Sequence, residues 1–209
     1  MEDRVRMIEF RKNSRVQMGI IPGHYATSHS HVNYYVDLTA VKTSVKTARE
    51  TAKELASQFM ATQTDTVICL EGTEILGAFL ADALSQGGIN VHQDISLVTP
   101  EINTNNQMLF RDNVQKKIWG KNVLLLISSA STGKSINRAV ECLQYYNGKL
   151  VGVGAIFSAI KEIHGMEVKS LFTEADLPSY MNFSPSECPM CKNGQKVDAL
   201  VNSFGYSKL

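Results

Sequence analysis

The stretch with the clearest chemical meaning is VLLLISSASTGKSI, at positions 123–136. Its apolar start predicts a buried strand that ends at Ile127, and a helix is expected from about Ser135. Small hydroxyl residues, one glycine and one lysine fill the loop: Ser128, Ser129, Ser131, Thr132, Gly133, Lys134 and Ser135. Amides at a helix N-terminus, with hydroxyls and a lysine charge beside them, bind a phosphate-sized anion. The hydroxyls could instead only cap the helix. Their number in one loop favours a phosphate or nucleotide site.

The same run ends like the P-loop motif G-x-x-x-x-G-K-[ST]. Ser128 stands where the first glycine of that motif belongs, and this glycine lets the backbone curl around phosphates. The apolar run at 150–158 (LVGVGAIFS) also lacks a terminal acid to hold the magnesium shell. A P-loop NTPase is therefore the second choice for this motif.

The segments around this run alternate between strand and helix. Apolar periodicity predicts helices over 5–15, 43–61, 75–84 and 135–146, and strands over 31–38, 66–70, 95–98, 123–127, 150–157 and 168–172. Short apolar strands alternating with helices are typical of an α/β fold, with a mostly parallel sheet flanked by helices. Ligands of such sheets bind at the carboxyl ends of the strands, where the hydroxyl-rich loop is expected.

Composition narrows the function classes further. The chain has 209 residues with 21 Lys and Arg against 20 Asp and Glu, a net charge of +1, so we expect no nucleic-acid partner. Its apolar runs are far shorter than the ~20 residues of a membrane span, and the N-terminus has no apolar signal-peptide core. Two of the four cysteines, Cys69 and Cys142, lie in apolar segments. We therefore expect a reduced, cytoplasmic protein without a membrane partner.

Four segments in order carry a family resemblance. They are GHY at 23–25 followed by His31 and YVD at 35–37, VICLEGTEILGAFLA at 67–81, the run at 123–136, and CPMCKNG at 188–194. Together they resemble the type I phosphoribosyltransferases, and the orotate phosphoribosyltransferases most closely. The resemblance implies one domain over 1–209, with a small N-terminal hood segment (1–38), an α/β core (39–177) and an irregular C-terminal extension (178–209).

The resemblance also implies a function. It is the joining of orotate to phosphoribosyl pyrophosphate (PRPP), assisted by Mg²⁺, to give a pyrimidine nucleotide and pyrophosphate. Residues Ser131–Ser135 would grip the 5-phosphate. The pyrophosphate loop would comprise Glu71, Gly72, Thr73 and Glu74, and the catalytic loop would retain the charges of Arg111, Lys116 and Lys117. The family further implies a homodimer.

Two departures from the family pattern concern the chemistry. The family's adjacent acids, which order the ribose hydroxyls and stabilise positive charge at the anomeric carbon, are replaced by Ile127 and Ser128. The segment that would form the catalytic lid, at 110–121, is short. An alternative function is therefore that of a non-catalytic relative that binds a nucleotide or phosphosugar, as a sensor or a partner subunit.

Cys188 and Cys191 have the spacing of half a zinc site. A closed site would need His164, the N-terminal histidines or a second subunit to supply the remaining ligands. A redox pair is a second possibility. A structural tail with reduced thiols is the interpretation that the sequence favours.

Overall fold

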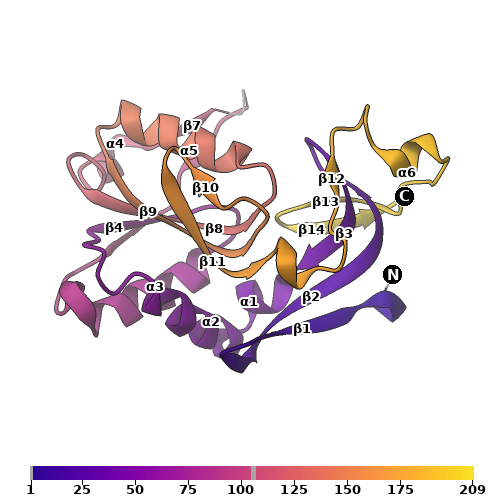
Figure 1. Ribbon diagram of the computed structural model, residues 1–209. Helices are drawn as coiled ribbons and strands as arrows, with labels where there is room; N and C mark the ends of the chain where they lie inside the picture. Colours follow the sequence, from indigo (N-terminus) through magenta and orange to yellow (C-terminus); the bar gives the residue numbers. More distant parts are fainter. Residues whose placement is uncertain (1, 105–106) are drawn as a thin grey trace.

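Strand β8 (Asn122–Ala130), which carries the run at 123–136, lies inside a six-stranded sheet that we call the core sheet. The structure, a computed structural model, describes residues 2–104 and 107–209 (Figure 1). The strand order is β10–β11–β9–β8–β4–β5. Its parallel strands are β8, β4 (Thr66–Cys69), β5 (Ser96–Val98), β9 (Lys149–Ser158) and β11 (Met166–Thr173), and β10 (Glu162–Ile163) pairs antiparallel with β11.

Helices cover both faces of the core sheet. On one face lie α2 (Val45–Ser57) and α3 (Glu74–Ser85), and on the other lies α5 (Lys134–Tyr145) (Figure 1). Alternate residues of β8 explain this arrangement, because Leu124 and Leu126 pack in the cluster with α2 and α3 while Leu125 and Ile127 pack in the cluster with α5. A strand buried on both faces reads as a continuous apolar run. The predicted α/β fold with a mostly parallel sheet is therefore confirmed.

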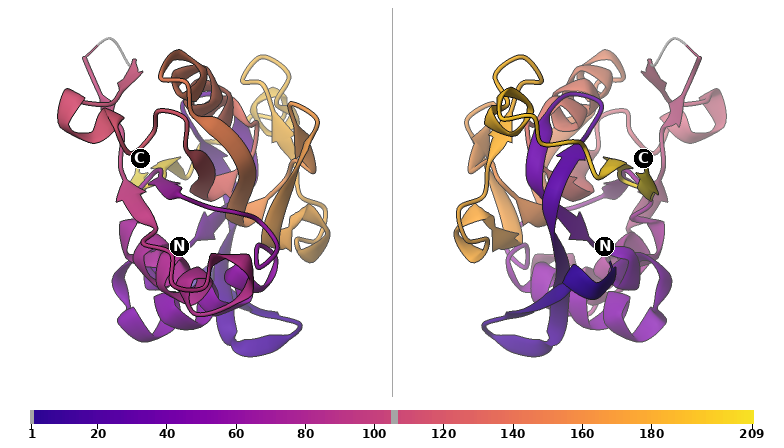
Figure 2. Two further views of the ribbon diagram at one scale, coloured as in Figure 1. Left: turned by 90° about the vertical axis from the view of Figure 1, so that its left-hand side faces the viewer. Right: turned by 90° about the vertical axis from the view of Figure 1, so that its right-hand side faces the viewer.

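The second sheet, which we call the hood sheet, combines the two ends of the chain. Its order is β12–β3–β2–β13–β14, with β1 paired to β2. The strands are β1 (Arg6–Phe10), β2 (Asn13–Ala26), β3 (His31–Asp37), β12 (Asn182–Phe183), β13 (Ala199–Asn202) and β14 (Gly205–Lys208). Both views of Figure 2 show these segments, from the two ends of the colour scale, side by side.

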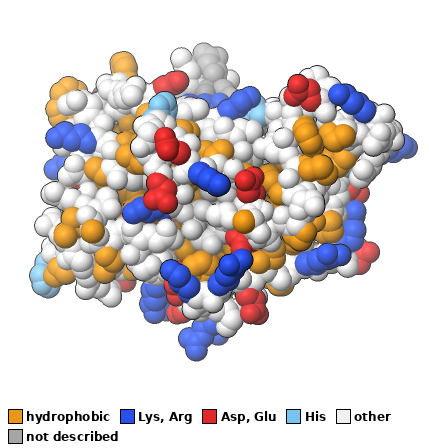
Figure 3. Space-filling model, in the orientation of Figure 1, with side chains coloured by type: hydrophobic (Ala, Val, Ile, Leu, Met, Phe, Trp, Pro, Cys, Tyr) orange, Lys and Arg blue, Asp and Glu red, His pale blue; other side chains and the backbone are white. Residues whose placement is uncertain are grey.

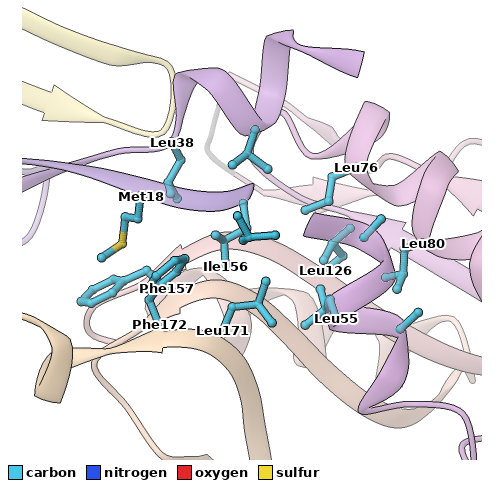
Figure 4. Close-up of a cluster of buried hydrophobic side chains, with 14 of the residues drawn as sticks. Met18, Leu38, Leu55, Leu76, Leu80, Leu126, Ile156, Phe157, Leu171 and Phe172 are labelled. Carbon is cyan, nitrogen blue, oxygen red and sulfur yellow. The ribbon is translucent and has the colours of Figure 1, made fainter. Parts of the chain in front are cut away.

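One long strand joins the two sheets. The first half of β2 packs into the core, where Met18 lies beside Phe157 and Phe172 (Figure 4). Its second half supplies Ile21 and Tyr25 to a separate cluster within the hood. The hood is therefore fixed to the core by continuous buried side chains.

The remaining elements are short. They are α1 (Thr39–Thr43), β6 (Glu101–Ile102), β7 (Met108–Leu109), α4 (Asp112–Gln115), α6 (Pro189–Lys192) and 3₁₀ turns at Glu2–Arg4, Gly88–Asn90 and Glu174–Asp176. None of the helices in the described part of the chain is both long and apolar enough to cross a bilayer. Basic and acidic side chains are interspersed over the face in Figure 3, in keeping with the balanced composition.

Two local predictions were wrong. Residues 5–15 form β1 and the start of β2 rather than a helix, because β1 pairs with β2 over Arg6–Phe10 in an antiparallel hairpin. The strand predicted to end at Ile127 continues to Ala130, because β9 runs beside it and pairs Ser129 with Phe157. The loop before α5 is correspondingly shorter, and it spans residues 131–133.

Candidate functional site

The turn between β8 and α5 leaves the start of the helix open. Gly133 is the N-cap of α5, with φ at +74°, and no side chain caps the helix there. The first amides of a helix have no partner within it, so at this end they can bind an anion. The alternative in which the loop hydroxyls serve as caps does not apply, because no side chain hydrogen-bonds to the start of α5 as a cap. The hydroxyl of Ser135 instead donates to Glu71 Oε1 at 2.7 Å.

A cavity of about 390 Å³ opens in front of this turn. One wall consists of the residues from Ser129 to Ile136 with Glu71, at the carboxyl ends of β8 and β4. The opposite wall belongs to the hood and the C-terminal segment, and comprises Thr27, Ser28, His29, Val32, Tyr34, Tyr35, Val36, Tyr180, Val201, Asn202 and Ser203. The cavity therefore lies where ligands bind to parallel sheets, and hydroxyls, amides and aromatic rings surround it.

Lys134 brings a full positive charge to the cavity. It is the first residue of α5, its side chain is exposed, and it is among the lining residues. The helix N-terminus adds the equivalent of about half a positive charge at the same place. This wall of the cavity is therefore electropositive where a phosphate would contact it.

Glu71 is the carboxylate in that wall. It follows β4 in a left-handed conformation, with φ at 57°, and Gly72 next to it has φ at 76°. Burial raises the pKa of Glu71 above its ordinary value, while the hydrogen bond from Ser135 and the charges of Lys42 and Arg138 act in the opposite direction. The turn thus holds a partly desolvated acid next to the uncapped amides at the start of α5.

The other residues of the predicted pyrophosphate loop do not share this position. Gly72 lines a smaller neighbouring pocket of about 230 Å³. Thr73 is buried, and its hydroxyl donates to the carbonyl oxygen of Leu70 at 2.8 Å, which is a structural contact. Glu74 begins α3 with an exposed side chain that accepts from Thr99 Oγ1 at 3.5 Å. Only Glu71 and Gly72 of the four therefore line either pocket.

The predicted loop cations lie elsewhere. Arg111 Nε and Nη2 each donate to Glu101 at 2.7 Å, in an ion pair at the base of the β6–β7 hairpin. Lys116 and Lys117 are exposed after α4. None of the three lines the cavity or the neighbouring pocket.

Neither position where the resemblance places an acid carries a charge, since one holds an isoleucine and the other a serine. Ile127 and Ser128 are each 1% exposed. Ile127 reaches the cavity, and Ser128 reaches the neighbouring pocket. The end of β8 therefore presents no carboxylate to a ligand.

Sequence reasoning missed the C-terminal part of the site. Asn182 Nδ2 donates to the carbonyl oxygen of Ser131 at 3.2 Å, so the tail contacts the turn before α5 directly. Lys42 Nζ donates to the carbonyl oxygen of Ser203, and this ties the β13–β14 turn to α1. Tyr180 packs edge-on against Phe157, and burial raises its pKa to about 12. Contacts between residues so far apart in sequence carry no local signal.

The cysteine pair meets two of the histidines. Among the described residues, His24, His31, Cys188 and Cys191 form a group whose ligand atoms all lie within 4.8 Å of one another. His164, the other histidine considered for this role, instead pairs with Asn137 Oδ1 at 2.8 Å. The hood thus brings the two cysteines of the tail together with a histidine from β2 and one from β3.

Comparisons with known proteins agree with this fold. No family model matches the chain. An orotate phosphoribosyltransferase from Thermotoga maritima is 35% identical over 77 residues, which are 36% of this chain and only 39% of that protein. The match thus spans well under two thirds of the length of that relative.

Solved structures match over more of the chain. An orotate phosphoribosyltransferase from Mycobacterium tuberculosis, solved with Fe(III) dicitrate, has a TM-score of 0.54 at 18% identity, over 76% of this chain and 91% of that one. An adenine phosphoribosyltransferase from Thermoanaerobacter pseudethanolicus has a TM-score of 0.53 at 14% identity, over 82% and 96%. The chain therefore has the type I phosphoribosyltransferase fold, and the resemblance seen in the sequence holds.

Proposed function

We propose that this chain binds a phosphoribosyl compound, either PRPP or a nucleotide, through its 5-phosphate. The observation that carries the proposal is the uncapped start of α5 at Gly133, which faces a cavity of about 390 Å³ beside Lys134. A phosphate there would accept hydrogen bonds from amides that have no partner within the helix, and would neutralise the lysine charge. The M. tuberculosis orotate phosphoribosyltransferase, which shares this fold, has been solved with PRPP and with inorganic phosphate.

The opposite wall suits the rest of such a ligand. Tyr34, Tyr35 and Tyr180 line the cavity with Asn202. Aromatic rings provide stacking surfaces for a planar base, and the amide can bond to its polar edge. By resemblance, we propose that the base is a pyrimidine.

We further propose that binding proceeds without efficient phosphoribosyl transfer. The transition state develops positive charge at the anomeric carbon, and preorganised opposite charge contributes most to the stabilisation of such states. Ile127 and Ser128 supply no charge at the end of β8, and Arg111 is already paired with Glu101 outside the cavity. The fold and the phosphate-binding turn are therefore retained while the catalytic groups are reduced.

Transfer of the phosphoribosyl group to orotate is the second candidate function. The observation in its favour is the carboxylate of Glu71 in the cavity wall. That group bonds to Ser135 and lies near Lys42, so one carboxylate would have to replace the two that the family pattern places on β8.

The residues that line the cavity decide whether the chain could hold Mg²⁺ by itself. Mg²⁺ prefers several oxygen ligands in octahedral geometry and uses one or two protein carboxylates. Glu71 is the single carboxylate among the residues described as lining the cavity, and it already accepts from Ser135. These residues fit a resident ion poorly, so we propose that magnesium would enter only as a complex with the diphosphate of PRPP.

A homodimer and a cytoplasmic location stay predictions. Sedimentation velocity measures the oligomeric state directly.

Isothermal titration calorimetry tests the proposed binding. We expect PRPP, uridine 5′-monophosphate and ribose 5-phosphate to bind, and unphosphorylated ribose to give no heat. Lys134→Met should lower the affinity for the three phosphorylated ligands about 10- to 100-fold, as expected for loss of a charged hydrogen-bond partner. Equal binding of ribose and ribose 5-phosphate would refute the phosphate site. The two candidate functions are separated by adding orotate to the PRPP complex and following the ultraviolet absorbance. Turnover at the rates of ordinary enzymes would favour phosphoribosyl transfer over binding alone.

A further inference from the structure

Two segments more than 150 residues apart bring four metal-binding side chains together. His24 is in β2 and His31 is in β3, while Cys188 precedes α6 and Cys191 lies within it. The donor atoms His24 Nε2 and His31 Nδ1 are 3.0 Å apart. Cys191 Sγ lies 3.7 Å from His24 Nε2 and 3.2 Å from His31 Nδ1, and Cys188 Sγ lies 3.6 Å from His24 Nε2.

Four of the six donor–donor separations are close to those of a tetrahedral zinc site, and the other two are no longer than 4.8 Å. With Zn–S bonds of about 2.3 Å and Zn–N bonds of about 2.0–2.1 Å, the ligand atoms of a tetrahedron lie roughly 3.3–3.8 Å apart. The four measured separations fall within, or a few tenths of an ångström below, that range. Two histidines and two cysteines are also one of the common ligand sets of structural zinc.

The surroundings of His24 orient it as a ligand. Its Nδ1 lies 2.9 Å from the carbonyl oxygen of Gln195. A carbonyl only accepts hydrogen bonds, so Nδ1 carries the proton and Nε2 presents its lone pair to the two sulfurs. Gln195 reaches this position because Gly194, with φ at +71°, turns the chain back after α6. Metal-ligating histidines characteristically have such a carbonyl partner.

The charges of the group also fit a divalent cation. His24 and Cys188 are each fully buried. Two thiolates with two neutral imidazoles carry two negative charges, which Zn²⁺ cancels, so the burial of this group involves no net charge. The geometry points to a structural zinc ion held by His24, His31, Cys188 and Cys191, which fastens the C-terminal segment to the hood.

The site adjoins the cavity through the chain between the two histidines. Thr27, Ser28 and His29 line the cavity, and Thr27 Oγ1 accepts from the amides of His29 and Ser30 in a tight turn. A metal that holds both ends of this turn fixes that wall. Zinc is therefore structural here, and its effect on ligand binding is indirect.

Metal analysis of the whole chain tests the proposal independently of any activity. We expect protein purified under reducing conditions and freed of loose metal to contain one equivalent of zinc. His31→Ala and Cys191→Ser should each lower zinc affinity at least about 100-fold, because each removes a direct ligand. Cys191 is exposed, so its serine variant keeps the packing of the fold. Circular dichroism verifies that it is folded.

Two matched variants serve as controls. Cys142→Ala removes another free cysteine, and His92→Asn removes an exposed histidine whose φ of 64° suits asparagine. Both should retain the zinc. Cobalt substitution gives a second readout, since thiolate-to-cobalt charge-transfer bands and the intense visible bands of tetrahedral cobalt should appear in the wild type and weaken in Cys191→Ser.

Three results would overturn the proposal. The first is failure of the reduced protein both to contain zinc and to bind added Zn²⁺. The second is a disulfide between Cys188 and Cys191 in protein isolated with its native redox state preserved. The third is full zinc content in the folded His31→Ala and Cys191→Ser variants.

Discussion

The turn at Gly133 offers the sharpest test of the proposed phosphate site. Gly133→Ala adds one methyl group at φ +74°, where an L-residue is strained. The added Cβ would lie 3.0 Å from the Cδ1 atoms of both Ile160 and Ile163. The backbone must therefore rotate or these side chains must shift, and either movement disturbs the amides at the start of α5.

The expected losses of stability and of phosphate affinity in Gly133→Ala follow from these two effects. The left-handed conformation costs about 1–2 kcal/mol for a residue with a Cβ. The two close contacts involve the ends of side chains that can move, so together they cost at most about 1 kcal/mol more. Loss of one charge-assisted amide contact to a phosphate costs about 1.5–3 kcal/mol, which is a decrease in affinity of about 10- to 100-fold.

Gly165→Ala is the matched control. Gly165 has almost the same φ, +75°, but nothing lies within 4 Å of its added Cβ, and it does not line the cavity. Urea unfolding should show destabilisation of about 1–2 kcal/mol in Gly165→Ala, from the left-handed conformation alone, and of about 1–3 kcal/mol in Gly133→Ala. Calorimetry with ribose 5-phosphate should show weakened binding in Gly133→Ala alone. Undiminished affinity in folded Gly133→Ala, or an equal loss in Gly165→Ala, would refute the role assigned to this turn.

Three further predictions concern the walls of the site. Burial raises the pKa of Glu71 above its ordinary value of 4.5, so the folded state binds this proton more tightly than the unfolded state does. The wild type therefore has its full stability from this proton below pH 4.5 and loses it as the pH rises through the pKa of the folded state. The stability of Glu71→Gln relative to wild type should therefore be greater at neutral pH than below pH 4.5 in urea unfolding, and a gap that does not change with pH would contradict this. Ile127→Asp places a carboxylate at a position that is 1% exposed, so it should lower the free energy of unfolding by at least about 3 kcal/mol in urea. An unchanged free energy of unfolding would show that the end of this strand is open to water. Removing zinc with a chelator should lower the melting temperature of the wild type but not of Cys191→Ser, and an equal shift in both would contradict the metal site.

The site was predictable where its residues are neighbours in sequence. The apolar run, the hydroxyl-rich turn and the helix after it form one continuous segment, so strand β8, the turn at Gly133 and helix α5 follow from local patterns. The alternation of short apolar strands with helices likewise predicted the parallel core sheet.

The parts that failed depend on pairing between distant segments. Residues 5–15 carry a weak helical pattern, and only the pairing of β1 with the partner strand β2 makes them extended. Asn182 reaches the carbonyl of Ser131 from 51 positions away, and Lys42 reaches Ser203 from the other end of the chain. Cys188 and Cys191 have the spacing of half a zinc site, but the sequence favoured a structural tail with reduced thiols. Only the folded hood brings His24 and His31 next to the two cysteines.

Amide chemical shifts give the most direct test of the central claim. We would assign the ¹H–¹⁵N spectrum of the chain and titrate ribose 5-phosphate, with ribose as the reference. Binding at the start of α5 predicts the largest shift changes at the amides of residues 131–136, with smaller changes along the hood wall and none of comparable size with ribose. Shift changes centred elsewhere, or the same changes with both sugars, would contradict a phosphate site at this turn.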